Sequence, residues 1–169
     1  INKNGVKSIH NDLVMKSPVE ITQLEVENIE NLEESLVLKY CTKNELEIIG
    51  DKLLITPFPA NKYKENKLKK DIRVYPVDFG NLSEEQLFFT LTVPDSYELD
   101  YAPESNTLKN SELDLEFSYM VQKMESYIQI MIKIKRGKTK YTPDEYKKLK
   151  TFYDLVVKSI NENIVLKKI

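Results

Sequence analysis

Leu113-Asp114-Leu115-Glu116-Phe117-Ser118-Tyr119-Met120-Val121 is the stretch that decides the fold. Apolar residues occupy every second position in it, so their side chains point to the same side of an extended chain. Isoleucines repeat this spacing from Ile128 to Ile134, after the short polar segment 122–126. The two alternating runs and the short connection between them predict a β-hairpin.

A period of two recurs on both sides of this hairpin. Alternating or short apolar runs predict further strands at 19–26, 36–40, 48–55, 74–77, 87–93, 97–99 and 164–166. The first run slips phase at Gln23, which indicates a β-bulge, and the third turns at Gly50-Asp51. Segment 61–71 is rich in lysine and asparagine and poor in apolar residues, so we expect an exposed connection inside the domain.

Helical periodicity is strong only near the end of the chain. Thr142-Pro143-Asp144-Glu145 forms a capping box, in which Glu145 accepts from the backbone of Thr142 and Pro143 takes the first helical position. The apolar stripe that follows consists of Tyr146, Leu149, Phe152, Tyr153, Val156, Val157 and Ile160. We predict a helix from about 142 to 161 that packs this stripe against a sheet.

These patterns together predict a mainly β fold, an antiparallel β-sandwich with one C-terminal amphipathic helix. We expect one domain over 16–169. Residues 1–15 would be a linker or the tail of a preceding domain. The chain starts at Ile1 without a charged and apolar leader, so we interpret it as a processed or excised fragment.

Composition limits the function. The 169 residues are 41% apolar and 31% charged, and 25 basic against 27 acidic residues leave a net charge of -2. Such a balance provides no general attraction to nucleic acid or anionic lipid. The longest apolar runs are far shorter than the roughly 20 residues that span a bilayer. We therefore predict no nucleic-acid partner and no membrane insertion.

The single cysteine and the single histidine offer little chemistry. Cys41 excludes an intrachain disulfide, and His10 alone leaves too few ligands for a zinc site. Cys41 follows a strand-like segment, whereas a reactive thiol often opens a helix that lowers its pKa. We expect a semi-buried cysteine at a strand end and an exposed His10. The sequence therefore predicts no catalytic residues, no metal site and no cofactor.

Charged clusters are explained more simply as solvated surface. Carboxylate pairs that a glycosidase could use occur at Glu33-Glu34, at Glu84-Glu85 and at Asp95 with Asp100. Basic residues interleaved with aromatic ones, as in single-strand-binding proteins, are Lys62, Tyr63, Lys64, Lys67, Lys69, Lys70, Arg73 and Tyr75. Acidic residues interrupt the basic run, so we interpret it as a solvated loop.

Tyrosines raise the alternative of a carbohydrate site. The chain has 10 tyrosines, and Tyr97, Tyr101 and Tyr119 could stack on sugar rings. Tyr119 is in phase with its apolar neighbours, which favours a place in the core. An aromatic row on one exposed sheet face would favour a ligand-binding module for glycan or cell-wall material.

Short motifs along the chain carry a family resemblance. They are Gly50-Asp51 before Leu54-Ile55-Thr56-Pro57, Arg73-Val74-Tyr75-Pro76-Val77-Asp78-Phe79-Gly80, Leu91-Thr92-Val93-Pro94 with Tyr97 and Pro103, Pro143-Asp144-Glu145-Tyr146 with Leu149 and Phe152-Tyr153, and Ile164-Val165-Leu166-Lys167. In this order they resemble the carboxyl-terminal domain of unknown function that follows a transglutaminase-like core in secreted or periplasmic proteins of Gram-negative bacteria.

The resemblance implies a non-catalytic accessory domain located in the periplasm or outside the cell. Its expected partner is the catalytic core of the same polypeptide, with a protein or glycan substrate as a further candidate. The candidate docking motif consists of Arg73, Tyr75, Pro76, Asp78 and Phe79. A structural explanation is also open, in which Pro76 lies on an edge strand, Asp78 turns the chain before Gly80, and Arg73 pairs with a carboxylate.

Overall fold

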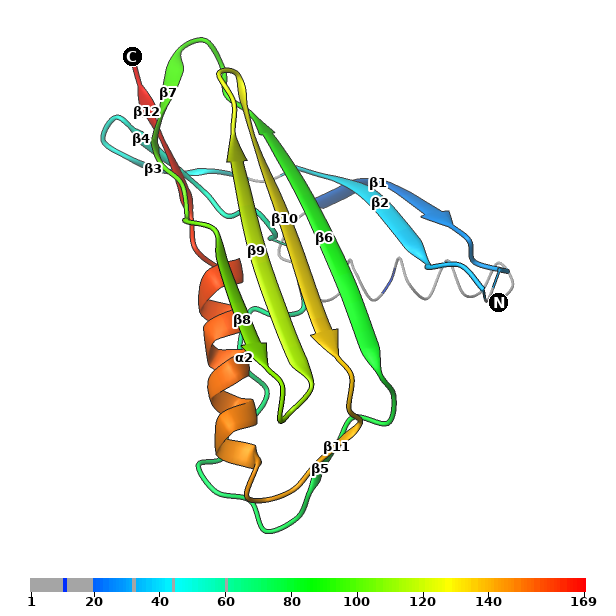
Figure 1. The fold of residues 1–169 in the computed structure, drawn as a ribbon. Coiled ribbons are helices and arrows are strands. Elements are labelled where there is room, and N and C mark those ends of the chain that lie inside the picture. Colours follow the sequence, from blue (N-terminus) through cyan, green and yellow to red (C-terminus); the bar gives the residue numbers. More distant parts are fainter. Residues whose placement is uncertain (1–10, 12–19, 32, 44, 60) are drawn as a thin grey trace. The chain divides into compact units, whose positions relative to one another are not determined.

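The computed structural model describes residues 11, 20–31, 33–43, 45–59 and 61–169 (Figure 1). The chain divides into two compact units. Residues 1–46 with 59–61 form the N-terminal unit, and residues 47–58 with 62–169 form the main unit. The predicted linker over 1–15 falls almost wholly outside the described residues, and one domain over 16–169 stays a prediction.

The described part of the N-terminal unit is a hairpin. Strand β1 (Glu20–Glu27) pairs antiparallel with β2 (Val37–Lys43). The register shifts between Ile21 and Gln23, which confirms the predicted bulge. Beyond the bulge, apolar residues of the two strands lie opposite each other; Val26, for example, is paired with Leu38.

The largest sheet of the main unit has the order β6-β10-β9-β8 and is fully antiparallel. Its strands are β6 (Ser83–Thr92), β8 (Asn106–Asn110), β9 (Leu115–Lys123) and β10 (Tyr127–Arg136). The predicted hairpin is its centre, since β9 and β10 are hydrogen-bonded neighbours. Every second residue is buried from Leu115 to Tyr119 and from Ile128 to Ile134, namely Leu115, Phe117, Tyr119, Ile128, Ile130, Ile132 and Ile134. The alternation therefore marks the core face of this sheet.

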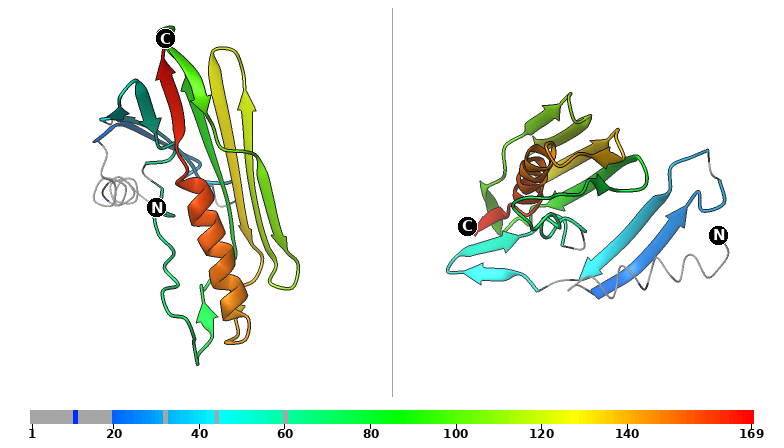
Figure 2. Two further views of the ribbon diagram at one scale, coloured as in Figure 1. Left: turned by 90° about the vertical axis from the view of Figure 1, so that its left-hand side faces the viewer. Right: turned by 90° about the horizontal axis from the view of Figure 1, so that it is seen from below.

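Helix α2 (Tyr146–Ile160) covers that face (Figure 2). Its buried residues are Tyr146, Leu149, Phe152, Tyr153, Val156 and Ile160. They belong to the same core cluster as the buried residues of β9 and β10. Predicted and observed stripes agree except at Val157, which is only half-buried.

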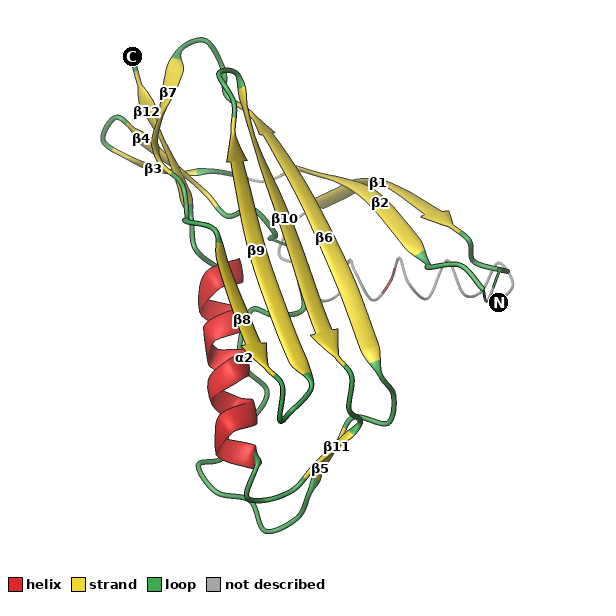
Figure 3. Cartoon of the chain, in the orientation of Figure 1, coloured by secondary structure: helices red, strands yellow, loops and turns green. Residues whose placement is uncertain are grey.

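A second antiparallel sheet completes the core. Its order is β3-β4-β12-β7, from β3 (Glu47–Ile49), β4 (Lys52–Ile55), β7 (Tyr97–Tyr101) and β12 (Ile164–Lys168). Ile55, Ile164 and Leu166 link it to the common core. A two-stranded sheet joins β5 (Val77–Asp78) to β11 (Lys140–Tyr141) (Figure 3). The predicted fold class is confirmed: mainly β, with antiparallel sheets and one C-terminal helix in the described part of the chain.

Two short strands and one irregular segment differ from the sequence predictions. Strands β8 and β11 had no prediction, because neither carries an alternating apolar run. A strand was predicted at 74–77, but only Val77 of it lies in a strand, β5. Pro76 has no N–H for a ladder bond, which accounts for the late start of β5.

Segment 61–71 is more tightly held than a solvated connection. The side chain of Asn66 donates to the carbonyl of Lys150 on α2 at 3.0 Å. The side chain of Asn161 donates to the carbonyl of Tyr63 at 2.7 Å. Leu68 and Tyr63 pack against the core. Most residues of the segment are exposed, as predicted for a connection inside the domain, and polar side chains also bind it to the helix.

Helix α2 begins at Tyr146 with Glu145 as its N-cap residue, so the predicted start at 142, with Pro143 in the first helical position, was wrong. Residues 143–145 form a turn before the helix, and the acidic member of the predicted capping box holds this turn. The Glu145 carboxylate accepts from the backbone N–H of Thr142 at 2.8 Å and pairs with Lys138 at 2.5 Å. The hydrogen bond from Lys138 and the one from the Thr142 backbone lower the pKa of Glu145. The predicted interaction between Glu145 and Thr142 is confirmed in this half of the box.

We expect Glu145→Ala to lower the free energy of unfolding by about 1 kcal/mol at pH 7. A depressed folded-state pKa gives stability that is present above the unfolded pKa and lost as pH falls through the folded value. The difference from wild type should therefore shrink as pH falls below the ordinary pKa of a glutamate carboxyl, in urea unfolding followed by circular dichroism. Glu112→Ala is the control, because Glu112 forms only an exposed pair with Lys148. Equal losses in both variants would contradict a role of Glu145 in holding the turn before α2.

Candidate functional site

The segment before β5 exposes three large apolar side chains in succession. Ile72 is 82% exposed, Val74 80% and Tyr75 80%. The side chain of Arg73, by contrast, contacts α2: its guanidinium carbon lies 5.8 Å from the centre of the Tyr146 ring. The expected carboxylate partner of Arg73 is thus replaced by an aromatic ring in the described structure. We call residues 72–75 the apolar loop.

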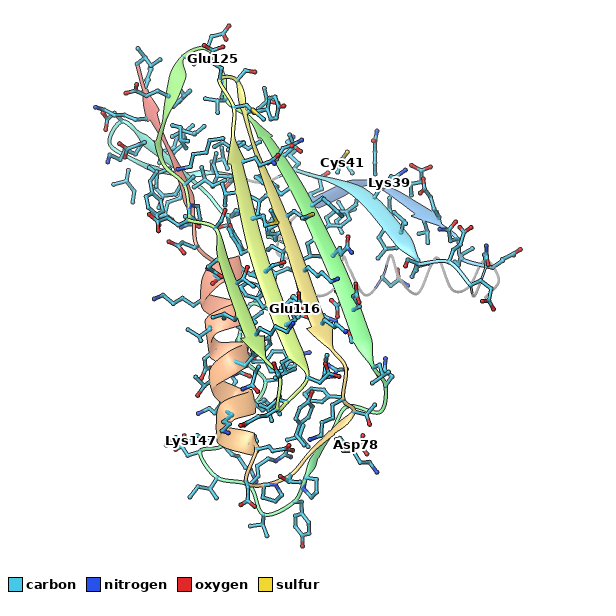
Figure 4. All side chains as sticks on the ribbon, viewed as in Figure 1. Lys39, Cys41, Asp78, Glu116, Glu125 and Lys147 are labelled. Atoms are coloured by element: carbon cyan, nitrogen blue, oxygen red, sulfur yellow. The ribbon has the colours of Figure 1, made fainter. Side chains whose placement is uncertain are left out.

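The end of the docking motif is structural. The amide of Gly80 donates to the Asp78 carboxylate at 2.9 Å, and Gly80 has a φ of 78°, which favours glycine. This confirms that Asp78 turns the chain (Figure 4). The hydrogen bond from Gly80 lowers the pKa of Asp78, with Lys140 at 3.4 Å also contributing. Pro76 lies just before β5 rather than within a strand.

Phe79 lines a cleft of the main unit. The cleft has a volume of about 280 Å³. Its lining comes from segment 62–68, from Phe79, from Arg136 at the end of β10, and from Tyr153 and Val157 on α2. Segments that are distant in the sequence therefore meet here, which no local pattern could indicate.

Arg136 is the central polar residue of this cleft. Its guanidinium carbon lies 4.0 Å from the centre of the Phe79 ring, a cation–π contact. Its terminal nitrogens donate to the Tyr153 hydroxyl at 3.3 Å and to the Asn81 carbonyl at 3.0 Å. Phe79 also packs on Tyr153, with ring centres 6.1 Å apart. The arginine is therefore held in one orientation.

Glu85 on β6 organises the neighbouring rim. Its carboxylate pairs with Lys62 at 2.5 Å and accepts from the hydroxyls of Ser83 and Tyr63. Burial raises the pKa of Tyr63, and the charge of Glu85 raises it further. Tyr63 therefore stays a neutral donor at any physiological pH.

Cys41 lies on β2 and is exposed, so the prediction of a semi-buried cysteine was wrong (Figure 4). Its thiol donates to the side-chain oxygen of Gln23 at 3.5 Å. His10 lies outside the described residues.

The geometry of β6 separates the carboxylates of Glu84 and Glu85. Glu84 and Glu85 alternate on β6, so Glu84 pairs with Lys133 while Glu85 pairs with Lys62. Asp100 pairs with Lys52. Among described residues, no group of three or more His, Cys, Asp or Glu side chains could hold a metal ion.

Two lysines of the basic run form ion pairs, and the tyrosines lie in different environments. Lys62 and Lys69 form ion pairs with Glu85 and Glu65. Tyr119 is fully buried, as its apolar phase predicted, and Tyr101 donates to Glu162. The three tyrosines considered for sugar stacking thus form no common exposed face. No helix in the described part of the chain is both long and apolar enough to cross a bilayer.

Comparisons with known proteins place the main unit in a family. The model of a family described as a domain of unknown function with a solved structure, DUF3858, matches residues 51–166. No curated protein matches the chain. A crystal structure of a "putative protease" from Parabacteroides distasonis is similar, with a TM-score of 0.52 and 13% identity over 63% of this chain. At that identity the likeness shows the fold alone.

The two matches cover different shares of the proteins compared. The aligned part spans only 20% of the Parabacteroides protein. The family match begins at residue 51, so it lies almost entirely within the main unit. Because it covers most of the 169 residues, the chain belongs to the DUF3858 family.

Proposed function

We propose that the main unit is a non-catalytic accessory domain that docks through the apolar loop onto a transglutaminase-like core of the same polypeptide. The observation that supports this proposal is the exposure of Ile72, Val74 and Tyr75, whose side chains are each at least 80% accessible to solvent. Contiguous exposed apolar side chains are typical of surfaces that bind another protein. An aromatic residue among them is a common anchor of such interfaces.

The loop is held at both ends, which favours recognition over disorder. Before it, the Tyr146 hydroxyl donates to the carbonyl of Lys70 at 2.7 Å. After it, Val77 is buried and pairs with Tyr141. A preorganised apolar surface loses little conformational entropy when it binds.

Two observations support a partner within the same polypeptide: the length of the similar Parabacteroides protein and the resemblance of the sequence motifs to a known family. The similar Parabacteroides protein is about five times longer than its aligned part. The sequence motifs resemble domains that follow a transglutaminase-like core in envelope proteins. We therefore propose a periplasmic or extracellular location and assign the catalytic residues to the core rather than to this chain.

We expect Tyr75→Ala to weaken binding of this chain to the separately expressed core at least about tenfold. Removing a buried aromatic anchor costs about 1.5–3 kcal/mol, and 1.4 kcal/mol corresponds to a factor of ten. Calorimetric titration of the chain into the core measures the dissociation constant.

Phe88→Ala is the matched control, because Phe88 is also an exposed aromatic residue, at 69%, but lies on β6. Its affinity should equal that of wild type. Heat no greater than dilution with both parts folded would reject the docking role. So would an equal loss of affinity in the two variants.

A further inference from the structure

The cleft beside Arg136 contains a cation that lacks an anionic partner among the described residues. Its two recorded hydrogen bonds go to neutral oxygens, those of Tyr153 and Asn81. Its Nε is buried without a recorded acceptor. Partial burial of a charge is costly unless an opposite charge compensates it. An anion at the open side of the guanidinium would therefore be stabilised.

The guanidinium also has donors to spare. Arginine carries five N–H donors, and the structure uses one on each terminal nitrogen. Each terminal nitrogen therefore retains one N–H, while the Nε–H is enclosed. Two donors on adjacent nitrogens match the two oxygens of a carboxylate. The stack on Phe79 restrains the plane of the guanidinium for such a contact.

The acids beside the cleft are already engaged. Glu85 pairs with Lys62 and also accepts from Ser83 and Tyr63. Glu65, which lines the cleft, pairs with Lys69 at 2.6 Å. Neither carboxylate is recorded on the guanidinium, so the internal acids leave its charge unneutralised.

The other residues that line the cleft indicate which chemical group the bound anion carries. Tyr63, Leu68, Phe79 and Val157 present rings and aliphatic groups, and Lys67 adds a second positive charge. The volume of about 280 Å³ lies just below the range of small-molecule sites, which begins near 300 Å³. One amino-acid residue with an apolar side chain is a suitable size.

We infer that this cleft is a binding site for a carboxylate attached to an apolar group, with Arg136 as the carboxylate-binding residue. The carboxylate would accept from the two terminal nitrogens, and the apolar group would pack on the Phe79 and Val157 side. The chemistry fits the carboxyl terminus of a peptide or an acidic side chain of a bound protein. The site stands independently of the docking role of the apolar loop.

The first test is an NMR titration of the 15N-labelled chain with N-acetyl-phenylalanine and with its amide. The acid should produce saturable shifts at Phe79, Tyr153 and the Arg136 Nε–H, with a dissociation constant on the order of millimolar. The amide has the same ring but no charge and should bind at least about tenfold more weakly. Equal binding of acid and amide, or no saturation, would overturn the inference.

Variants locate the site. Arg136→Gln should weaken binding of N-acetyl-phenylalanine at least about tenfold. Lys135→Gln is the matched control, since it removes the same charge from the adjacent residue of β10, outside the cleft. Lys67→Gln leaves the arginine stack intact and should weaken binding about two- to fivefold. Wild-type affinity in a folded Arg136→Gln would overturn the inference. If that variant folds poorly, wild-type affinity in Lys67→Gln would overturn it.

A third probe, N-acetyl-aspartate amide, carries its carboxylate on a side chain. Tighter binding of N-acetyl-phenylalanine would assign the site to a peptide terminus, and tighter binding of the aspartate probe would assign it to an acidic side chain. Either order of affinity of the two probes supports carboxylate recognition, provided that Arg136→Gln abolishes the binding of the tighter probe.

Discussion

Val156→Asp is expected to unfold the main unit at neutral pH. Val156 is completely buried on the face of α2 that packs against the large sheet. A carboxylate placed there loses its hydration and finds no charged partner in an apolar core. We expect a loss of at least about 4 kcal/mol, a large fraction of the usual stability of a domain. Loss of the cooperative thermal transition, followed by circular dichroism, measures it.

The control is the neighbouring residue of the same helix. Leu155 is 42% exposed, and Leu155→Asp introduces the same charge on the outer side of α2. Its cost should stay within about 1 kcal/mol. Similar losses at the two positions would mean that the helix does not use this face to cover the sheet.

The sign of the pH dependence gives a second readout for Val156→Asp. Burial raises the folded-state pKa of an introduced carboxyl above its unfolded value of about 3.9. The folded state then holds a proton that the unfolded state releases, so stability falls as pH rises between the two values. The deficit relative to wild type should therefore be smaller at pH 4 than at pH 7. A loss caused only by changed packing would be the same at both.

Phe117→Ala is expected to lower the free energy of unfolding by about 3–5 kcal/mol. Phe117 has no exposed surface and lies in the middle of β9, between Leu108 of β8 and Ile134 of β10. Its truncation removes apolar contacts on the core face and leaves a cavity. Urea unfolding should show a lower midpoint with an unchanged slope.

Phe88→Ala provides the comparison within the same sheet. Phe88 lies on β6 with 69% of its surface exposed, so the same chemical change should cost less than about 1 kcal/mol. The difference between the two variants measures burial rather than residue type. Comparable losses would contradict the assignment of the core face.

Local patterns predicted the elements whose side chains repeat regularly. The hairpin of β9 and β10 followed from alternation alone, because a period of two selects one face of an extended chain. The bulge at Gln23 followed from a break in the same period, and the body of α2 followed from its apolar stripe, although the helix begins at Tyr146 rather than at 142. Strand β8 escaped prediction because Leu108 is its one apolar residue, and pairing with β9 places it in the sheet.

The candidate sites depended on contacts between distant residues. The sequence presented Val74 and Tyr75 as strand residues, and only the folded chain shows that nothing described covers them. Arg136 ended an alternating run and had no distinguishing signal. Its environment comes from Phe79, 57 positions earlier, and from Tyr153 on α2, which follows β10 through β11.

The sequence by itself therefore determined the mainly β class, the core hairpin and the amphipathic helix, because side-chain periodicity and capping are local properties of the backbone. Tertiary structure alone decided which apolar residues stay in water, where Cys41 points, and how the Arg136 cleft is assembled. Those properties depend on long-range packing, in which residues far apart along the chain exclude water from one side chain and leave another exposed.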